Sequence, residues 1–228
     1  MKRLLALIMA ALFGAAIVYL ILPFVLLVLT GPFPDRGLLA GLFLAVSLEK
    51  IWAMYFRMRQ RHEADKSSDW TTVSVGVACA LTMYLLIGEV FLRQRGIAHP
   101  ALSILGATLF VTAISFRYWA FHHLGHQWAV HLDRPLEDRD LVTDGPYGIV
   151  RHPLYTAYCL ELISLPLVFN AYWALIPALC FFIPLEVHRA RYEERLLRDT
   201  FGPAYDLYAR RTPAFLPVPT GNAYDRSA

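Results

Sequence analysis

The sequence predicts an all-α polytopic membrane protein with about six transmembrane helices. Of its 228 residues 57% are hydrophobic and only 17% are charged, which is too apolar for an ordinary soluble domain. The apolar residues form runs of about 20, the length that crosses a bilayer as a helix. No segment alternates apolar and polar residues over the length that a strand of a membrane barrel requires.

The first half of the chain contains apolar runs at about residues 4–30, 38–56, 71–92 and 101–119, and each is predicted to be a span. Charged residues, Pro or Gly bound these runs. The first run follows a basic N-terminus, as in a signal peptide, but it is far longer than the roughly 7–15 residues of a signal-peptide core. We therefore expect it to be retained as the first transmembrane helix.

A fifth apolar region, at about residues 154–187, is too long for one span. Pro166, Asn170 and Pro177 interrupt it, and such residues favour a turn or a kink. It therefore predicts a helical hairpin that turns near Asn170. Beyond the hairpin, residues 186–210 have the pattern of an amphipathic surface helix that is broken at Gly202 and Pro203.

The distribution of basic residues predicts the orientation in the membrane. Most of the 21 Lys and Arg residues fall on one side of the predicted spans, and only Arg36, Arg93 and Arg95 fall on the other. Cytoplasmic loops carry the excess of positive charge. Both termini, the loop at residues 117–151 and the C-terminal tail are therefore expected on the cytoplasmic face.

A charged motif precedes the first helix of the hairpin. Pro153 suits the first turn of a helix, which leaves Arg151 and His152 just outside it. The amide groups and positive dipole at a helix start favour an anionic group. In isolation, Arg151 could equally be a headgroup anchor and His152 a simple cap.

A second polar block follows the hairpin. Glu193 and Glu194 are succeeded by a Phe-Gly pair, two tyrosines, two arginines and a Phe-Leu-Pro ending. Taken alone, this block could be a solvated helix face with pairs such as Glu194 with Arg198.

Together the two blocks, LVTDGPYGIVRHPLY at 141–155 and EERLLRDTFGPAYDLYARR followed by FLP at 193–217, resemble the isoprenylcysteine carboxyl methyltransferase family, within a broader group that includes phospholipid N-methyltransferases. The resemblance extends over about residues 124–217. Together with the predicted spans, it divides the chain into an N-terminal four-span region, residues 1–122, and a cofactor-binding catalytic region, residues 123–228, in a single integrated domain.

The resemblance also implies the chemistry. S-adenosyl-L-methionine would lie between the Arg-His-Pro segment and the C-terminal helix, and a lipophilic or lipidated acceptor would enter from the bilayer. His152 and Tyr155 would hold the cofactor, and Glu194 or Glu193 would bind its cationic or hydroxyl part. Arg211 and Arg189 are candidates for the acceptor's carboxylate, because a guanidinium pairs with a carboxylate through two hydrogen bonds. The other cofactor-binding candidates are Leu141, Val142, Gly145, Tyr147 and Arg151.

Methyl transfer to a carboxylate needs no base, whereas an amine or thiol acceptor would need one, and Glu161 in the fifth span is the candidate. The alternatives are an NADPH-dependent sterol-type membrane reductase, a phospholipid N-methyltransferase and a non-enzymatic membrane scaffold. Glu49, Lys50 and Glu89 also fall within spans, where structural pairing is the simplest expectation.

Neither a metal nor a nucleic acid is predicted as a partner. His122 and His126 are one helical turn apart, but no carboxylate or thiolate completes a ligand set at the usual spacing. Cys79, Cys159 and Cys180 lie in apolar runs without ligand spacing. The net charge of +3 arises from basic residues at the ends of spans and not from one basic stripe.

Overall fold

The computed structural model describes residues 70–93, 98–125 and 140–217, together with isolated positions among the first 48 residues. All regular structure in these ranges is helical, and they contain no strand. The predicted all-α class is therefore confirmed. The predicted spans at 4–30 and 38–56, with Glu49 and Lys50, lie outside the described residues apart from those isolated positions, so the count of six spans stays a prediction.

Three helices in the described ranges are long and apolar enough to cross a membrane: residues Ser74–Arg93 of α3 (Trp70–Arg93), α4 (Pro100–Leu124) and the continuous helix Tyr172–Phe201. The last consists of η2 (Tyr172–Ala174), α7 (Leu175–Pro177), η3 (Ala178–Phe182) and α8 (Ile183–Phe201). A shorter apolar helix, α6 (Pro153–Phe169), precedes it. The chain is therefore an α-helical membrane protein.

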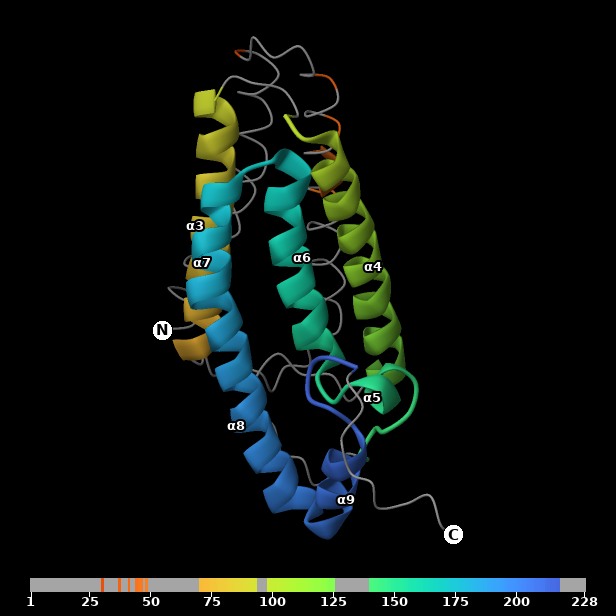
Figure 1. Cartoon of the computed structure of the whole chain (residues 1–228). Coiled ribbons are helices and arrows are strands. Elements are labelled where there is room, and N and C mark those ends of the chain that lie inside the picture. Colours follow the sequence, from red (N-terminus) through yellow and green to blue (C-terminus); the bar gives the residue numbers. More distant parts are fainter. Residues whose placement is uncertain are drawn as a thin grey trace, which may run out of the picture. The chain divides into compact units, whose positions relative to one another are not determined.

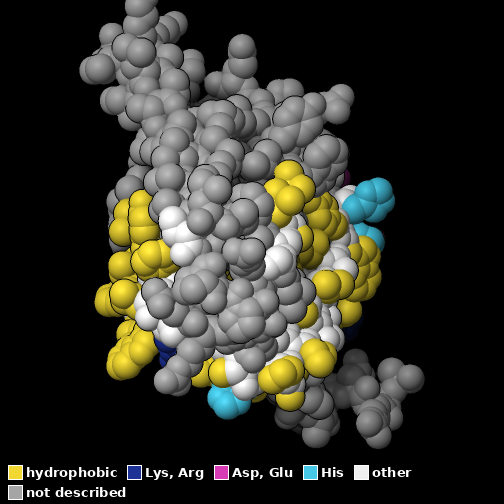
Figure 2. Space-filling model, turned by 90° about the horizontal axis from the view of Figure 1, so that it is seen from above, with side chains coloured by type: hydrophobic (Ala, Val, Ile, Leu, Met, Phe, Trp, Pro, Cys, Tyr) yellow, Lys and Arg dark blue, Asp and Glu magenta, His cyan; other side chains and the backbone are white. Residues whose placement is uncertain are grey.

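Exposed apolar side chains on these helices fit a lipid environment. Ile104 and Val111 of α4 are 68% and 62% exposed, and Val77 of α3 is 62% exposed. Figure 2 shows that the described side chains visible from that side are mainly hydrophobic. Extensive exposed apolar surface is unfavourable in water and normal against lipid.

The chain divides into two compact units, residues 1–60 with 87–98 and residues 61–86 with 99–228. In the described part of the first unit, Glu89 is buried and pairs with Arg93 one helical turn later at 2.5 Å. This pairing explains a carboxylate within an apolar helix. The candidate site described below belongs to the second unit.

Helices α4 and α6 lie side by side in close contact (Figure 1). Their approach depends on Gly106, where an added Cβ would stand 2.6 Å from the backbone nitrogen of Val168 and 2.9 Å from the carbonyl of Ser164. Small residues permit such close backbone contact between membrane helices. The α4 helix ends five residues beyond the predicted span, and Arg117 is consequently buried within it rather than lying in a loop.

Asn170 forms the turn between α6 and the helix that follows. Its backbone is left-handed, with φ of 53°, which Asn tolerates better than most residues. Its side-chain oxygen accepts the backbone N–H of His99 at 2.6 Å, and its amide donates to the Ser103 hydroxyl at 2.8 Å. These bonds join the turn to the start of α4. Deeper in the unit, Leu162 of α6 packs with Phe182 and with Ala78 of α3.

The polar segments meet at the other end of α6, where α5 (Pro146–Ile149) and α9 (Pro203–Arg211) lie (Figure 1). Gly202, with φ of 52°, separates α8 from α9. After α9 the chain continues as residues 212–217, which we call the C-terminal strap. The strap returns to the start of α6 and completes the candidate site.

Candidate functional site

The start of α6 is built by a Gly-Pro turn and by an imidazole in the N-cap position. Gly145 has φ of 54°, and an added Cβ there would collide with the His123 ring, so Gly is required twice over. Pro153 occupies the first turn of α6, as predicted. His152 precedes it, and its side chain makes no capping bond. Its imidazole is therefore available for other partners.

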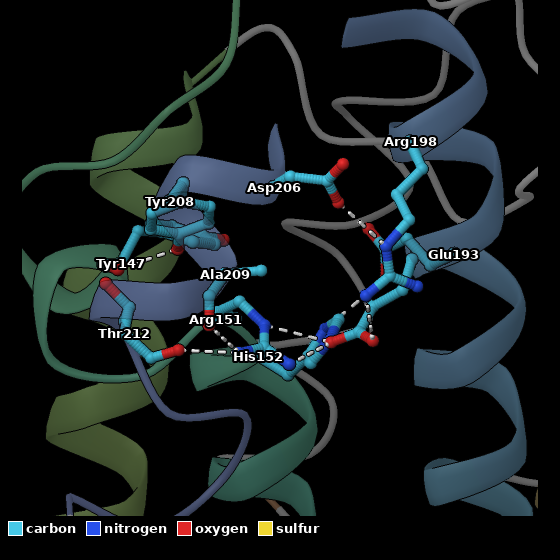
Figure 3. A network of polar contacts seen from close by, with 10 residues as sticks. Tyr147, Arg151, His152, Glu193, Arg198, Asp206, Tyr208, Ala209 and Thr212 are labelled. Carbon is cyan, nitrogen blue, oxygen red and sulfur yellow. Dashed lines mark hydrogen bonds and ion pairs between the residues drawn. The ribbon is translucent and has the colours of Figure 1, made fainter. Parts of the chain in front are cut away.

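Arg151 connects the start of α6 to two other segments (Figure 3). Its Nε and Nη2 donate to Oε1 of Glu194 on α8, at 2.9 and 2.6 Å. Its Nη1 donates to the carbonyls of Ala209 and Thr212, at 2.9 and 2.6 Å. The Arg151 and Glu194 side chains are each only 13% exposed. One guanidinium thus holds α6, α8 and the end of α9 together.

The His152 ring lies beside the same carboxylate. Its Nε2 is 3.1 Å from Oε1 of Glu194, and its Nδ1 is 3.8 Å from Oε2 of Glu193. The ring is 4% exposed and lies near two aromatic rings, with centroid distances of 5.7 Å to Tyr155 and 5.5 Å to Phe215. One oxygen of Glu194 therefore serves both Arg151 and His152, which favours its ionised form.

The strap occupies the amides at the start of α6. The backbone N–H groups of Arg151 and His152 donate to the carbonyls of Pro213 and Ala214, at 2.8 and 3.0 Å. The Thr156 hydroxyl donates to the Phe215 carbonyl at 3.1 Å. These amides were expected to attract an anionic group. They bind the chain's own carbonyls instead, because Thr212 and its neighbours return beside them.

Two tyrosines complete the polar network on the side of α5, one through its hydroxyl and the other through its backbone carbonyl. Tyr208 of α9 donates to the Tyr147 carbonyl at 2.7 Å (Figure 3). Burial raises the pKa of the Tyr208 hydroxyl above its ordinary value. Burial, and then the nearby Glu193 carboxylate, raises the pKa of the Tyr147 hydroxyl as well. Both hydroxyls are therefore protonated at neutral pH, and that of Tyr208 is a donor.

Arg198 joins α8 to α9 beside the cluster. It pairs with Glu194 Oε2 at 3.8 Å, with Asp206 at 3.3 Å, and lies over the Tyr205 ring at 5.6 Å. The i,i+4 pair expected of a solvated helix face is present. Glu194 consequently pairs both with Arg198 on that face and with the buried Arg151 and His152.

The sequence-predicted site residues fall into two groups. Tyr147, Arg151, His152, Tyr155, Glu193 and Glu194 lie together, and Tyr155 is hydrogen-bonded to Glu193. Half-buried Leu141 and Val142 lie in the irregular segment before Gly145, and Arg211 is exposed on α9. Arg189 is buried on α8, with Nε 3.9 Å from Oε2 of Glu186.

Glu161 lies apart from the cluster. It pairs with Arg117 of α4, whose Nη1 is 2.8 and 2.9 Å from the two carboxylate oxygens, and both side chains are almost fully buried. The pair joins α4 to α6 in the interior of the unit. Its geometry is that of a structural ion pair.

Sequence reasoning did not identify several residues of this region. Glu186 and Arg117 are buried charges whose positions become informative only once their partners are known. Thr212 takes part through its backbone carbonyl, which accepts a hydrogen bond from Arg151, and no side-chain pattern can reveal such a contact. Phe215 was signalled by the aromatic-Leu-Pro ending but was given no role.

Comparison with known proteins identifies the family of this site. The model of the isoprenylcysteine carboxyl methyltransferase family matches residues 105–199, a range that contains Arg151, His152 and Glu194. Protein-S-isoprenylcysteine O-methyltransferase B of Arabidopsis thaliana is 33% identical over 118 residues, which are 50% of this chain and 55% of the plant protein. The chain belongs to the isoprenylcysteine carboxyl methyltransferase family. The predicted family is thereby confirmed.

The chain is also similar to bacterial proteins whose names do not mention methyl transfer. Uncharacterized protein YpbQ of Bacillus subtilis is 31% identical over 124 residues, 52% of this chain and 72% of that protein. Cobalt-zinc-cadmium resistance protein CzcN of Cupriavidus metallidurans is 37% identical over 99 residues, 41% of this chain and 43% of that protein. The chain thus matches about half the length of most of these relatives. Among the described residues, no group of three or more His, Cys, Asp or Glu could hold a metal ion, and His126 lies outside them.

Proposed function

We propose that this member of the isoprenylcysteine carboxyl methyltransferase family transfers the methyl group of S-adenosyl-L-methionine to the carboxylate of a lipophilic acceptor. The observation that carries the proposal is the Arg151, His152 and Glu194 cluster at the start of an apolar helix, flanked by Tyr155 and Phe215. The orientation with both termini in the cytoplasm, which the basic residues favour, puts this cluster at the cytoplasmic edge of the membrane.

The donor set fits the proposed cofactor. Glu193 is 35% exposed while Tyr155 is bonded to it, so its carboxylate can accept hydrogen bonds from an ammonium or a ribose hydroxyl. The rings of His152, Tyr155 and Phe215 suit an adenine face or a sulfonium, since aromatic faces attract cations. Glu194 has one oxygen bonded to Arg151 and His152, so we assign cofactor contact to Glu193 and the positioning of His152 to Glu194.

Arg151 is accordingly proposed as a positioning residue rather than a cofactor ligand. Its Nε and both Nη atoms are bonded to Glu194 and to two backbone carbonyls. The backbone N–H groups of residues 151 and 152 already donate to carbonyls of the strap, so they cannot bind an anion. Recognition of an anionic group therefore depends on side chains, with Arg189 and Arg211 proposed for the acceptor carboxylate.

When bound, the cofactor supplies an electrophilic methyl on a sulfonium: a carboxylate oxygen forms the new C–O bond while the S–CH₃ electron pair returns to sulfur. This step transfers no proton, so the chain needs no general base for a carboxylate acceptor. The task of its residues is to hold both partners in line and to exclude water, which can supply most of the acceleration. Glu161, paired with Arg117, is proposed as a base only if the acceptor is an amine or a thiol.

The test is incubation of the purified protein in detergent with methyl-labelled S-adenosyl-L-methionine and a prenylated N-acetylcysteine. We expect a labelled product that releases methanol on mild alkaline treatment, as a methyl ester does. His152→Ala and Glu193→Gln should abolish or strongly reduce the label, while exposed Arg191→Ala should retain it. Thermal stabilisation by NADPH but not by S-adenosylhomocysteine would overturn the proposal in favour of a reductase.

A further inference from the structure

Glu186 is a buried carboxylate on α8 whose hydrogen bonding is incomplete. It is 3% exposed, and its Oε2 is buried without a hydrogen-bond partner. The nearest cation is Nε of Arg189, at 3.9 Å from that oxygen. This distance allows electrostatic attraction but exceeds that of a hydrogen bond. A buried acceptor left unsatisfied costs about 1–3 kcal/mol, and more when it is charged.

The position of Glu186 relates it to the candidate site. Residues 186, 189 and 193 are three and seven positions apart, so Glu186, Arg189 and Glu193 share one face of α8. That face is turned toward α6, because Tyr155 and Cys159 both lie within electrostatic range of Glu186. A polar strip therefore leads from the apolar part of α8 to the carboxylate that binds Tyr155.

A structural ion pair elsewhere in the same unit provides a comparison. Glu161 faces Arg117 at 2.8 Å, within hydrogen-bonding distance, although both side chains are buried between apolar helices. Arg189 lies one turn away from Glu186, but the two side chains are not in hydrogen-bonding contact. Oε2 of Glu186 is thus buried near a cation without a hydrogen bond to it.

We infer that Glu186 accepts a hydrogen bond from an N–H group of the methyl acceptor, next to the carboxylate that Arg189 holds. This inference rests on the proposed function. In a lipophilic amino acid derivative the nitrogen and the carboxylate are attached to one carbon, so they are neighbours, as Glu186 and Arg189 are. Glu186 is then a specificity-determining residue, since it distinguishes such an acceptor from a plain lipophilic carboxylate.

The experiment compares two acceptors with the same prenyl tail and the same carboxylate. One is S-prenyl N-acetylcysteine, and the other is the S-prenyl 3-mercaptopropionate that lacks the acetamido group. We expect wild-type kcat/KM to be about 10-fold higher for the acceptor with the N–H, the effect of one hydrogen bond. Glu186→Leu should remove this preference by lowering kcat/KM for the first acceptor and leaving that for the second unchanged.

Three further proteins make the result decisive. Glu186→Gln should retain much of the preference, because its amide oxygen still accepts a hydrogen bond, and Glu186→Ala replaces the Leu variant if that variant does not fold. Glu89→Gln removes another buried carboxylate, the one paired with Arg93, and should keep the wild-type ratio. Retained stabilisation by S-adenosylhomocysteine verifies that each variant is folded.

The outcomes separate the inference from the proposed function. A wild-type ratio near one, or a ratio unchanged in both Glu186→Leu and Glu186→Ala, would overturn the role of Glu186 while carboxyl methylation stands. Failure of wild-type protein to form a base-labile methyl ester with either acceptor would overturn the proposed function, and the inference with it.

Discussion

Replacement of Arg151 by Ala should destabilise the protein and release the strap. The change deletes two charge-assisted hydrogen bonds to Glu194 and two bonds to the carbonyls of Ala209 and Thr212. Both ionic side chains are only 13% exposed, so Glu194 would be left largely buried without its main counter-charge. Breaking a buried pair by removing one partner costs about 3–5 kcal/mol. For a chain of this size, such a loss corresponds to a melting temperature lower by about 10 °C.

Two measurements in detergent test this expectation. Thermal unfolding gives the loss of stability, and limited trypsin digestion reports the strap, because Arg210 and Arg211 directly precede it. Cleavage there should be faster in Arg151→Ala than in wild type. Arg151→Lys should lie between the two, because an ammonium cannot reproduce the planar fork that reaches both Glu194 and the carbonyls.

Exposed Arg191 on α8 provides the matched control, since Arg191→Ala also removes one positive charge but leaves the four hydrogen bonds of Arg151 intact. The reasoning is refuted if Arg151→Ala melts within about 2 °C of Arg191→Ala and its strap is cleaved no faster. In that case the four bonds of Arg151 would be replaceable by water, and the strap would be held by other contacts.

Four further predictions follow from the same contacts. Gly106→Leu should destabilise the α4 and α6 packing by about 1–3 kcal/mol or more, measured by thermal unfolding, since its Cβ has no room. Glu161→Leu alone should be strongly destabilising, and combination with Arg117→Leu should recover much of the loss, as a double-mutant cycle would reveal. Phe215→Ala should weaken stabilisation by S-adenosylhomocysteine, because it removes a ring beside His152. The raised pKa of Tyr208 means that the folded state retains its proton above pH of about 10, where the unfolded chain loses it. Stability should therefore fall as pH rises beyond that point, and less steeply in Tyr208→Phe.

Local signals along the chain predicted the ends of elements well. Pro153 marks the start of α6, because a proline ring suits the first turn of a helix, where its missing N–H costs no hydrogen bond. Gly202 and Pro203 mark the change from α8 to α9, where a positive φ is required. In each case the physical cause lies within a few neighbouring residues, so the sequence contains it in full.

Pairings between distant residues could not be predicted in the same way. Glu161 was recognised as a costly intramembrane charge, but its partner Arg117 was interpreted as a basic loop residue. Whether the two side chains meet depends on how α4 and α6 are rotated about their axes. Small residues such as Gly106 set that rotation through packing, which a single sequence does not specify.

The sequence predicted which residues form the candidate site better than it predicted the hydrogen bonds among them. The structure brings Arg151, His152 and Glu194 together, as expected of two motifs that flank a helical hairpin. The function of the strap was not foreseen, since Pro213 and Ala214 act through backbone carbonyls, which every residue carries. Side-chain patterns give no information about such backbone contacts.

The return of the strap to the start of α6 has a consequence for biosynthesis. A ribosome makes the helices from α3 to α8 before it reaches Pro213 and Phe215, so these helices can enter the bilayer while the His152 ring still lacks its neighbour. Membrane insertion and completion of the site are thus separate events in the life of each molecule. A nonsense mutation just after α9 would remove the strap, and with it the Phe215 ring beside His152, while every helix from α3 to α9 is still made.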